Sequence, residues 1–550
     1  MRVGGKIQTL LREECMNRRN FIGASGAAAL AGALGSAAPA AMPEPQAALP
    51  TTPARRPNII LFMPDEVRAD SFGCYGNPVA KTPNLDRLAA QGARFANCHV
   101  QYPVCGASRC SLLTGWPTSV RGHRSLYYFL RPEEPNLFRE LRRAGYDVFW
   151  YGKNDALAAQ SFDASVTEWA TPGVPRPAGR AAGVVPVQSL TPGALSFLMS
   201  AGGDRRATAD YACLTAGIKI LERAETERPF CLFLPLSGAH PPYTAPADFY
   251  HLYAPASLPP LVPPGGAKKP SFHQGMRDYY HLGGLSDAVF RQIRAVYYAK
   301  VSYTDWLAGE LMAALERTGR DKDTAIFVLA DHGDYAGDYG LVEKWPSGLE
   351  DCLTHVPLLA RVPGGKPGVV AEDMVELYDV MATALDLAGT RAEHTHFARS
   401  LMPQLGGGAG DAQRAAFAEG GYNVYEPQCY EPLGAGGGIY EGKIRLQNER
   451  PVTVSRSAMV RTRTHKLIVR PQDQSELYDS VRDPGERHNL YGERGVAAVQ
   501  AQLEAQLLEH FLNTTGIAPR DKDSRACPPF YPTRTDIPAA GWQAGVLGSG

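Results

Sequence analysis

Four short apolar segments, separated by helical patterns, impose the strongest constraint on how this chain folds. The segments cover residues 58–63, 147–151, 230–234 and 324–329. Helical patterns between them cover, among others, residues 84–91, 136–144 and 291–315. Apolar strands that alternate with helices are typical of a mostly parallel sheet with helices on both faces. We therefore expect an α/β fold with one large central sheet.

Side chains that can bind a metal ion or an anion follow all four apolar segments. In chain order they are Asp65 and Glu66, Lys153, His240, and Asp331 and His332. In open α/β sheets, ligands bind at the carboxyl ends of the strands. The spacing therefore predicts that these side chains meet in one site at that edge of the sheet.

Asp65, Glu66, Asp331 and His332 are the candidate metal ligands. A mostly oxygen set favours a hard divalent cation, with Ca²⁺ as the first choice and Mg²⁺ as an alternative. The single imidazole keeps Mn²⁺ open as well. Each acidic pair alone would also suit a solvated turn, but two pairs at parallel strand ends favour a metal site.

Four basic residues are candidates for binding an anionic substrate, namely Arg109, Lys153, His240 and Lys344. A tetrahedral anion needs several fixed donors, which also stabilise charge as it moves to the leaving oxygen. Taken singly, each lysine is more often a solvated surface charge, and His240 could be a histidine of the core.

The stretch from Cys105 to Gly115 reads Cys-Gly-Ala-Ser-Arg-Cys-Ser-Leu-Leu-Thr-Gly. It resembles the sequence by which type I sulfatases mark one cysteine for oxidation to formylglycine. The hydrated aldehyde has two geminal hydroxyls: one would attack sulfur, and the other would release sulfate by re-forming the aldehyde. A cysteine followed by small residues is also common as a buried side chain at a helix start. The other motifs of the chain are therefore needed to distinguish a functional cysteine from a structural one.

The resemblance to type I sulfatases extends over roughly residues 55–490, and its motifs occur in the family's order. They are Pro57-Asn58-Ile59-Ile60, Gly73-Cys74-Tyr75-Gly76-Asn77, Thr82-Pro83-Asn84-Leu85, Gly152-Lys153, His240-Pro241-Pro242-Tyr243, Asp331-His332-Gly333-Asp334 and Glu476-Leu477-Tyr478-Asp479. The resemblance implies an alkaline-phosphatase-like α/β fold.

The same resemblance assigns a role to each candidate residue. Asp65, Glu66, Asp331 and His332 would hold the metal beside residue 105, and Arg109, Lys153, His240 and Lys344 would bind the sulfate. Asp331 would also take a proton from the formylglycine hydrate.

Two positions depart from the family pattern. Glu66 stands where the family usually has an aspartate or an amide, so its longer side chain could ligate differently or point toward substrate. The family commonly reads Gly-Lys-Trp-His where this chain reads Gly152-Lys153-Asn154-Asp155. Asn154, Asp155 or His123 could take the place of that histidine, and the sequence leaves the choice open.

Composition shifts divide the chain into three expected parts: an export signal at 1–41, a sulfatase catalytic domain at 55–402 and a C-terminal subdomain at 412–550. In the subdomain, 459–468 and 476–479 are predicted to be two short strands of an antiparallel sheet and 496–512 a helix, which makes it α+β. The stretch 403–411 is predicted to be a linker. Long loops at 171–194, 254–275 and 422–446 are expected to set specificity.

The N-terminal segment resembles a twin-arginine export signal, with Arg18-Arg19 ahead of an Ala/Gly-rich stretch and a cleavage site near Ala38-Pro39-Ala40. A short membrane anchor is the alternative, but the stretch falls short of the ~20 apolar residues that a spanning helix needs. We expect a periplasmic or secreted protein without stable membrane insertion.

The ten cysteines are few for a chain of this length, so disulfides are not expected to form the main scaffold. Removing Cys15 with the signal and Cys105 by modification leaves an even number, which permits pairing. Cys429 and Cys527 are candidates for a disulfide.

Lys+Arg and Asp+Glu both number 56, and this balance argues against a nucleic-acid partner. We expect a sulfuric ester hydrolase that acts on a sulfated small molecule or glycan, such as a sugar, aryl or alkyl sulfate. Its maturation would require a formylglycine-generating enzyme. One alternative is a phosphonate monoester or phosphodiester hydrolase of the same superfamily. The other is a non-catalytic exported binding protein with an unmodified Cys105.

Overall fold

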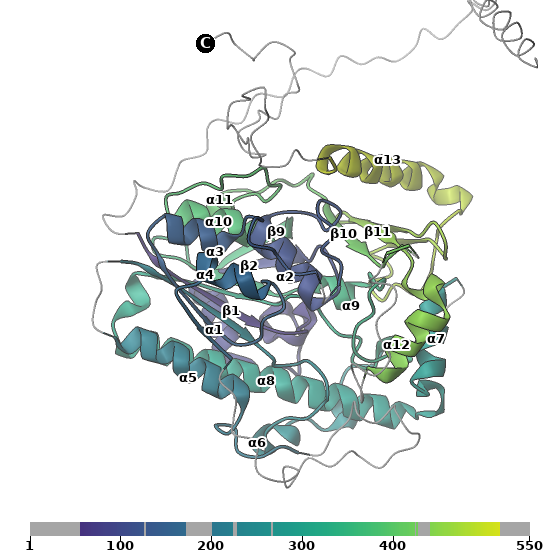
Figure 1. Cartoon of the computed structure of the whole chain (residues 1–550). Helices are drawn as coiled ribbons and strands as arrows, with labels where there is room; N and C mark the ends of the chain where they lie inside the picture. The colour runs from purple at the N-terminus through teal and green to yellow at the C-terminus, as the bar shows by residue number, and fades with distance from the viewer. Residues whose placement is uncertain are drawn as a thin grey trace, which may run out of the picture. The chain divides into compact units, whose positions relative to one another are not determined.

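The computed structural model describes residues 56–125, 128–171, 201–223, 228–265, 268–423, 425–426 and 440–516 (Figure 1). All of them fall within one compact unit of the chain. The predicted signal at 1–41, most of the 171–194 loop, Cys429 and Cys527 lie outside the described residues, so these expectations stay predictions. The same holds for the boundaries predicted between the catalytic domain and the C-terminal subdomain.

The main sheet of the described residues has nine strands and is mostly parallel on one side, as predicted. Its order is β4 (Glu168–Ala170), β3 (Asp147–Tyr151), β5 (Phe230–Leu236), β1 (Asn58–Pro64), β6 (Thr324–Leu329), β8 (Leu358–Arg361), β2 (Ala93–His99) and β7 (His355–Val356), and β9 (Val369–Glu376) pairs with β2. From β4 to β6 all neighbours run parallel, whereas β8 is antiparallel to both β6 and β2. The four apolar segments of the sequence are β1, β3, β5 and β6.

Helices cover both faces of this sheet (Figure 1). One layer contains α1 (Pro83–Gln91), α5 (Ala209–Glu222) and α8 (Asp287–Arg317). The other contains α2 (Cys105–Thr114), α3 (Leu137–Arg143) and α10 (Asp379–Leu387). Every residue of the central strands β1, β5 and β6 is buried, which explains why these strands are almost entirely apolar.

A second, antiparallel sheet follows the order β10 (Ala416–Gly420), β11 (Ser457–Arg461), β12 (His465–Val469) and β13 (Glu476–Asp479). Helix α13 (Ala497–Thr514) packs on it through a small apolar cluster that includes Val460, Leu467 and Leu503. This confirms the α+β character predicted for the C-terminal part. The predicted 403–411 linker starts within the short helix α11 (Met402–Leu405).

The prediction of a single strand over 459–468 was wrong, because the structure divides it into β11 and β12. The chain turns at 462–464, where the Thr462 N–H donates to the carbonyl of His465 at 2.9 Å. The turn Thr462-Arg463-Thr464 contains no Gly, Pro or Asn, which are the usual signals of a hairpin. The sequence therefore carried no local sign of the reversal.

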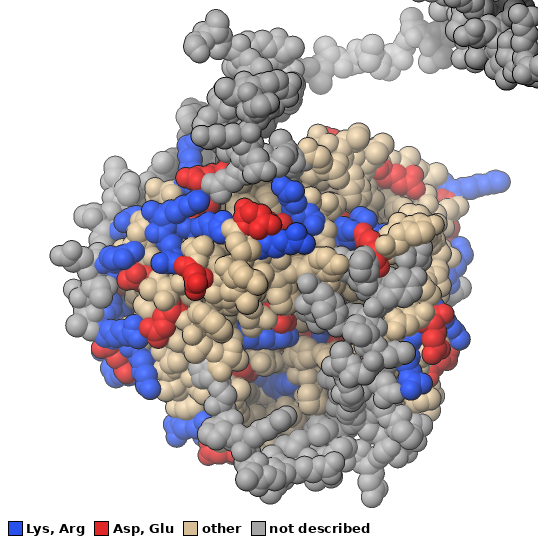
Figure 2. Space-filling model, in the orientation of Figure 1, with Lys and Arg blue, Asp and Glu red and all other residues tan. Residues whose placement is uncertain are grey.

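The charged side chains on the surface agree with the balanced numbers of basic and acidic residues. On the face in Figure 2, Lys and Arg side chains lie among Asp and Glu side chains, with the densest basic group in the upper part.

No disulfide joins the cysteines in the described part of the chain: Cys74, Cys98, Cys105, Cys110, Cys213, Cys231 and Cys352 are all free. Among the described helices, none has the length and apolar character that crossing a membrane requires.

One contact between helices gives a pH-dependent prediction. Asp305 of α8 accepts hydrogen bonds from the Leu85 N–H at 2.8 Å and the Asn84 amide at 2.9 Å. Burial raises the pKa of Asp305 to about 6. Because the pKa of Asp305 is higher in the folded than in the unfolded protein, folding favours the neutral carboxyl. Its contribution to stability is complete at a pH below the pKa of the unfolded protein and is lost as the pH rises through about 6. Relative to wild type, Asp305→Asn should therefore gain about 2–3 kcal/mol of unfolding free energy between pH 4 and pH 7.

Urea unfolding of both proteins at pH 4, 5, 6 and 7 measures this difference. The pH 4 pair is the internal control, because there the wild-type carboxyl is neutral like the amide. A difference that stays constant over the whole range would contradict the prediction.

Candidate active site

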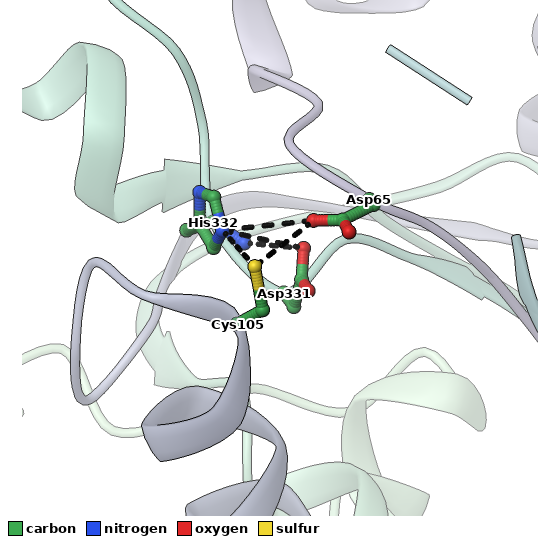
Figure 3. A group of neighbouring side chains, drawn as sticks. All are labelled: Asp65, Cys105, Asp331 and His332. Carbon is green, nitrogen blue, oxygen red and sulfur yellow. Dashed lines mark hydrogen bonds and ion pairs between the residues drawn. The ribbon is translucent and has the colours of Figure 1, made fainter. Parts of the chain in front are cut away.

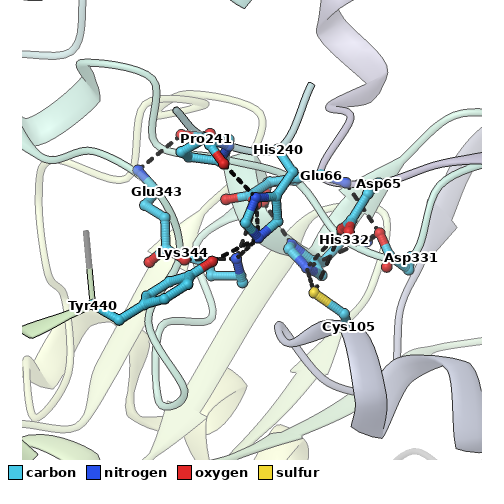
Figure 4. Close-up of polar contacts among 12 residues, drawn as sticks. Asp65, Glu66, Cys105, His240, Pro241, Asp331, His332, Glu343, Lys344 and Tyr440 are labelled. Atoms are coloured by element: carbon cyan, nitrogen blue, oxygen red, sulfur yellow. Dashed lines mark hydrogen bonds and ion pairs between the residues drawn. The ribbon is translucent and has the colours of Figure 1, made fainter. Parts of the chain in front are cut away.

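The structure brings together every residue that the sequence predicted for the site. The carboxyl ends of β3, β5, β1 and β6 are neighbours in the sheet, so the segments that follow them converge. They meet at the first turn of α2, where Cys105 lies (Figure 4). The converging residues are Asp65, Glu66, Arg109, Lys153, His240, Asp331, His332 and Lys344.

Local structure explains the fixed positions of the cysteine motif. Helix α2 is buried along its whole length, so its small residues allow close packing in the core. It ends at Gly115, which adopts a left-handed conformation with φ of 68° and donates its N–H to the Ser111 carbonyl. A side chain at this position would lie 2.9 Å from His396 and Met381. The motif therefore specifies a short, buried helix that begins at Cys105.

Cys105 is surrounded by polar groups of three kinds. Its Sγ lies 3.1 Å from His332 Nε2, 3.5 Å from Asp65 Oδ1 and 3.7 Å from Lys153 Nζ. Burial, reinforced by Asp65, raises the pKa of the thiol well above its usual value. An unmodified Cys105 is therefore a neutral thiol and a poor nucleophile.

Asp65, Cys105, Asp331 and His332 form a compact group whose potential ligand atoms all lie within 4.8 Å of one another (Figure 3). His332 Nδ1 lies 2.8 Å from the Gly333 carbonyl, which can only accept, so Nδ1 carries the proton and Nε2 keeps its lone pair toward the group. Burial lowers the pKa of His332, which keeps it neutral. Burial alone would raise the pKa of Asp65, but Lys153 and Arg109 hold it well below its usual value.

Glu66 points into a neighbouring group rather than into the group around Cys105. Its Oε2 lies 2.9 Å from Lys344 Nζ and 3.7 Å from His240 Nε2. Lys344 also pairs with Glu343 at 2.6 Å and lies 3.1 Å from His240 Nε2. Burial raises the pKa of Glu66 well above its usual value, although Lys344 opposes the shift. The longer side chain at this position thus reaches Lys344 and His240, two of the basic residues predicted to bind the substrate.

Arg109 and Asp331 form a buried ion pair beneath Cys105. Arg109 donates from Nε at 2.8 Å and lies 2.7 Å from the same Asp331 oxygen through its second terminal nitrogen. The other Asp331 oxygen accepts the N–H groups of Glu66 and His332, both at 3.0 Å. One terminal nitrogen of Arg109 has no hydrogen-bond partner among the described residues although it is buried. A buried donor of this kind is suited to an anionic ligand.

Of the three candidates for the family's missing histidine, only Asp155 contacts the site. Its carboxylate lies 2.8 Å from Lys153 Nζ, which also pairs with Asp65 at 2.7 Å. Asn154 uses its side chain to cap the following turn through Ala156 and Leu157. His123 is engaged by the Tyr128 carbonyl and by Glu134.

Three residues of the site were missed by the sequence analysis. Glu343 holds Lys344, and its position next to that lysine was a usable signal. Tyr440, two hundred residues after His240, places its hydroxyl 2.7 Å from His240 Nε2 (Figure 4). Lys300 of α8 donates to the carbonyls of His240 and Pro242 and so fixes that loop. Neither Tyr440 nor Lys300 had a local signal, because each acts through a contact with a remote segment.

Comparisons with known proteins agree with this geometry. The sequence model of the sulfatase family matches residues 57–390, and that of the N-sulphoglucosamine sulphohydrolase C-terminal region matches 447–512. An arylsulfatase of Clostridium perfringens is 26% identical over 365 residues, which cover 60% of this chain and 75% of that protein.

Two solved structures share the fold. A phosphonate monoester hydrolase of Agrobacterium radiobacter superposes with a TM-score of 0.69 at 21% identity, covering 84% of this chain and 96% of its own. The complex of BT4656 with its substrate D-glucosamine-2-N,6-O-disulfate has a TM-score of 0.64 at 21% identity, covering 84% and 98%. These likenesses confirm the predicted alkaline-phosphatase-like fold. Because the family match covers more than half of the chain and includes Cys105, the chain belongs to the sulfatase family and is a sulfate ester hydrolase.

Proposed function

We propose that this protein hydrolyses the sulfate ester of a small molecule or glycan. The nucleophile is residue 105, after Cys105 has been oxidised to formylglycine, with a divalent cation bound beside it. The observation that carries the proposal is the surroundings of Cys105. The Lys153 ammonium, the neutral imidazole of His332 and the Asp65 carboxylate all lie within 3.7 Å of its Sγ. In the oxidised residue an oxygen takes the place of that sulfur, and a hydrated aldehyde supplies the nucleophilic hydroxyl that a neutral thiol lacks.

The residues present fit a divalent cation. Asp65 and Asp331 offer two carboxylates, and His332 offers an unprotonated Nε2 whose lone pair can bind a cation. Residue 105 completes the set. When bound, the cation would polarise the substrate's oxygen and lower the pKa of the attacking hydroxyl. Since Glu66 lies with Lys344, the oxygen of residue 105 takes its place in the set, which stays mostly oxygen with one imidazole and keeps Ca²⁺ as the first choice, with Mg²⁺ or Mn²⁺ open. Glu66 as a direct ligand stays a prediction.

The chain's own residues would bind the sulfate and hold its protons. Arg109, Lys153, His240 and Lys344 surround the position where sulfate oxygens would lie, and each lysine ammonium is fixed by two carboxylates. These pre-positioned cations would stabilise charge as it moves to the leaving oxygen. Asp331, the predicted proton acceptor, already accepts from Arg109 and two backbone N–H groups, and Asp65 Oδ1 lies 3.5 Å from the Cys105 sulfur.

Mass spectrometry of the tryptic peptide 95–109 tests the modification, using protein from its native host. An aldehyde or its hydrate at position 105 is expected, and a thiol in every preparation would contradict the proposal. A panel of phenyl sulfate, diphenyl phosphate and phenyl phosphonate monoester tests the reaction. Dominant kcat/KM for the sulfate is expected, whereas dominant turnover of a phosphorus ester would favour the alternative hydrolase. Metal analysis of the active protein identifies the ion.

The glycine before Lys153 gives a further prediction. Gly152 has φ of 143°, and an added Cβ would lie 2.2 Å from the Pro235 carbonyl oxygen, which also accepts the Lys153 N–H. Gly152→Ala must therefore displace Lys153 from Asp65 and residue 105. We expect kcat/KM for phenyl sulfate to fall at least about tenfold, since small misplacements of a positioned group are costly.

Gly145→Ala is the matched control, because Gly145 has φ of 88° near the other end of β3 and, among the described residues, its Cβ would meet Arg56 alone, at 3.6 Å. It should lower the thermal unfolding temperature through backbone strain but keep kcat/KM. Equal kinetic losses in the two variants would show that the effect is not local to Lys153.

A further inference from the structure

Helix α12 (Glu441–Glu449) brings a third lysine, Lys443, beside the residues proposed to bind the sulfate. Lys443 is 4% exposed, and its Nζ lies 5.6 Å from the centroid of the Tyr440 ring. The same ring has Lys344 Nζ at 5.9 Å from its centroid, and its hydroxyl contacts His240. Lys443 and Lys344 therefore both lie against the ring of Tyr440.

Lys443 differs from the other basic residues of the site in its counter-charges. Lys344 pairs with Glu66 and Glu343, and Lys153 pairs with Asp65 and Asp155. In the described part of the chain, the contact that Lys443 makes is the one with the Tyr440 ring, and no carboxylate pairs with it. A buried charge without a partner is costly, and an aromatic face offsets only part of that cost. The arrangement is therefore suited to an anion that comes from outside the protein.

The polar character continues along the same face of α12. Tyr440, Lys443 and Gln447 are spaced so that they lie on one side of the helix. Gln447 is fully buried, and neither its amide nitrogen nor its amide oxygen has a hydrogen-bond partner among the described residues. A buried amide without a partner, on the same helix face as a lysine that pairs with no described carboxylate, is unusual for a helix that packs only against protein.

We infer that Lys443, next to Tyr440, forms a subsite for a second anionic oxygen group on the substrate. This group is a carboxylate or a second sulfate, carried by the alcohol part of the ester a few bonds from the sulfate that is cleaved. The inference rests on the proposed function, because it takes Lys344 and His240 as the residues that bind the scissile sulfate. It narrows the substrate class from sulfate esters in general to esters whose leaving group is itself anionic.

Three esters that differ in one group test the subsite: phenyl sulfate, 3-carboxyphenyl sulfate and 1,3-phenylene disulfate. Lys443→Met should lower kcat/KM for the two dianions about 10- to 100-fold, as expected for a lost charge-assisted contact. The loss for phenyl sulfate should be smaller. Lys443→Arg keeps the charge and should retain the preference for dianions. The two dianions distinguish a carboxylate site from a sulfate site.

Arg445→Met is the matched control, since Arg445 is an exposed cation on the same helix, and it should change none of the three values. Titration calorimetry of the same ligands with Cys105→Ala, with and without Lys443→Met, measures binding without turnover. If the wild type cleaves no sulfate ester but Cys105→Ala prefers the dianions through Lys443, the proposed function fails and the subsite stands. An equal effect of Lys443→Met on all three ligands, or no effect, would overturn the subsite.

Discussion

Replacement of Cys105 by alanine is expected to lower kcat for sulfate esters by at least about four orders of magnitude, as losses of covalent nucleophiles do. The side chain lies where the Lys153 ammonium, an imidazole and a carboxylate converge, and Cys105 is the one thiol that the described residues place in that group. Cys105→Ala should still bind a sulfate ester, because Arg109, Lys153, His240 and Lys344 are unchanged. Single-turnover kinetics and calorimetry with phenyl sulfate separate the two effects.

Cys110→Ala provides the control for a cysteine lost from the same helix. Cys110 is also buried, and its Sγ lies 3.6 Å from the Ala156 carbonyl oxygen, away from the group around Cys105. Its replacement should leave kcat within about threefold, since surface and core changes away from the reacting atoms act mainly on stability. Comparable kcat for Cys105→Ala and Cys110→Ala would refute position 105 as the nucleophile.

The second large effect is expected for Asp331→Asn. One Asp331 oxygen binds two backbone N–H groups and the other binds Arg109, so the residue joins the strand end of β6 to α2 and to the segment after β1. An amide cannot accept at both positions, and it leaves the Arg109 charge with Asp65 alone at 3.3 Å. We expect a fall in kcat/KM of at least about 1,000-fold, loss of the bound divalent ion, and destabilisation of about 3 kcal/mol.

Asp379→Asn is the control with the same contacts in another place. Asp379 is fully buried, accepts the N–H groups of Glu376 and Arg399, and pairs with Arg414 at 2.6 Å. Its amide variant should lose a similar unfolding free energy in urea while the folded fraction keeps its kcat and its metal. If both variants lost activity only in proportion to their stability, Asp331 would be a structural residue and not part of the site.

Several elements of the site were predictable because they depend on local sequence. The strands β1, β3, β5 and β6 are apolar except for their first residue in three of them, so their ends, and the polar residues after them, could be placed without knowing any contact. The cysteine motif likewise combines a helix start at Cys105 with a glycine cap at Gly115. Residues positioned by a strand end or a helix end are the ones that a sequence pattern identifies.

Other features depend on contacts between segments that are far apart in the chain. Glu66 was predicted among the metal ligands, but its side chain is held by Lys344, 278 residues later. The turn between β11 and β12 has no turn-forming residues, and it forms because both strands pair within the small sheet. Lys300 acts on His240 only because α8 packs beneath that loop.

The sequence by itself determined the α/β class, the strand ends that carry the polar residues and the motif that marks Cys105, because apolar period, helix caps and short motifs are properties of neighbouring residues. Only the tertiary structure decided which carboxylate pairs with which cation, that Asp155 is the candidate that reaches the site, and that Tyr440 and Lys443 border it. The physical reason is that ion pairs and buried charges depend on distance and desolvation. Both are set when remote segments pack together.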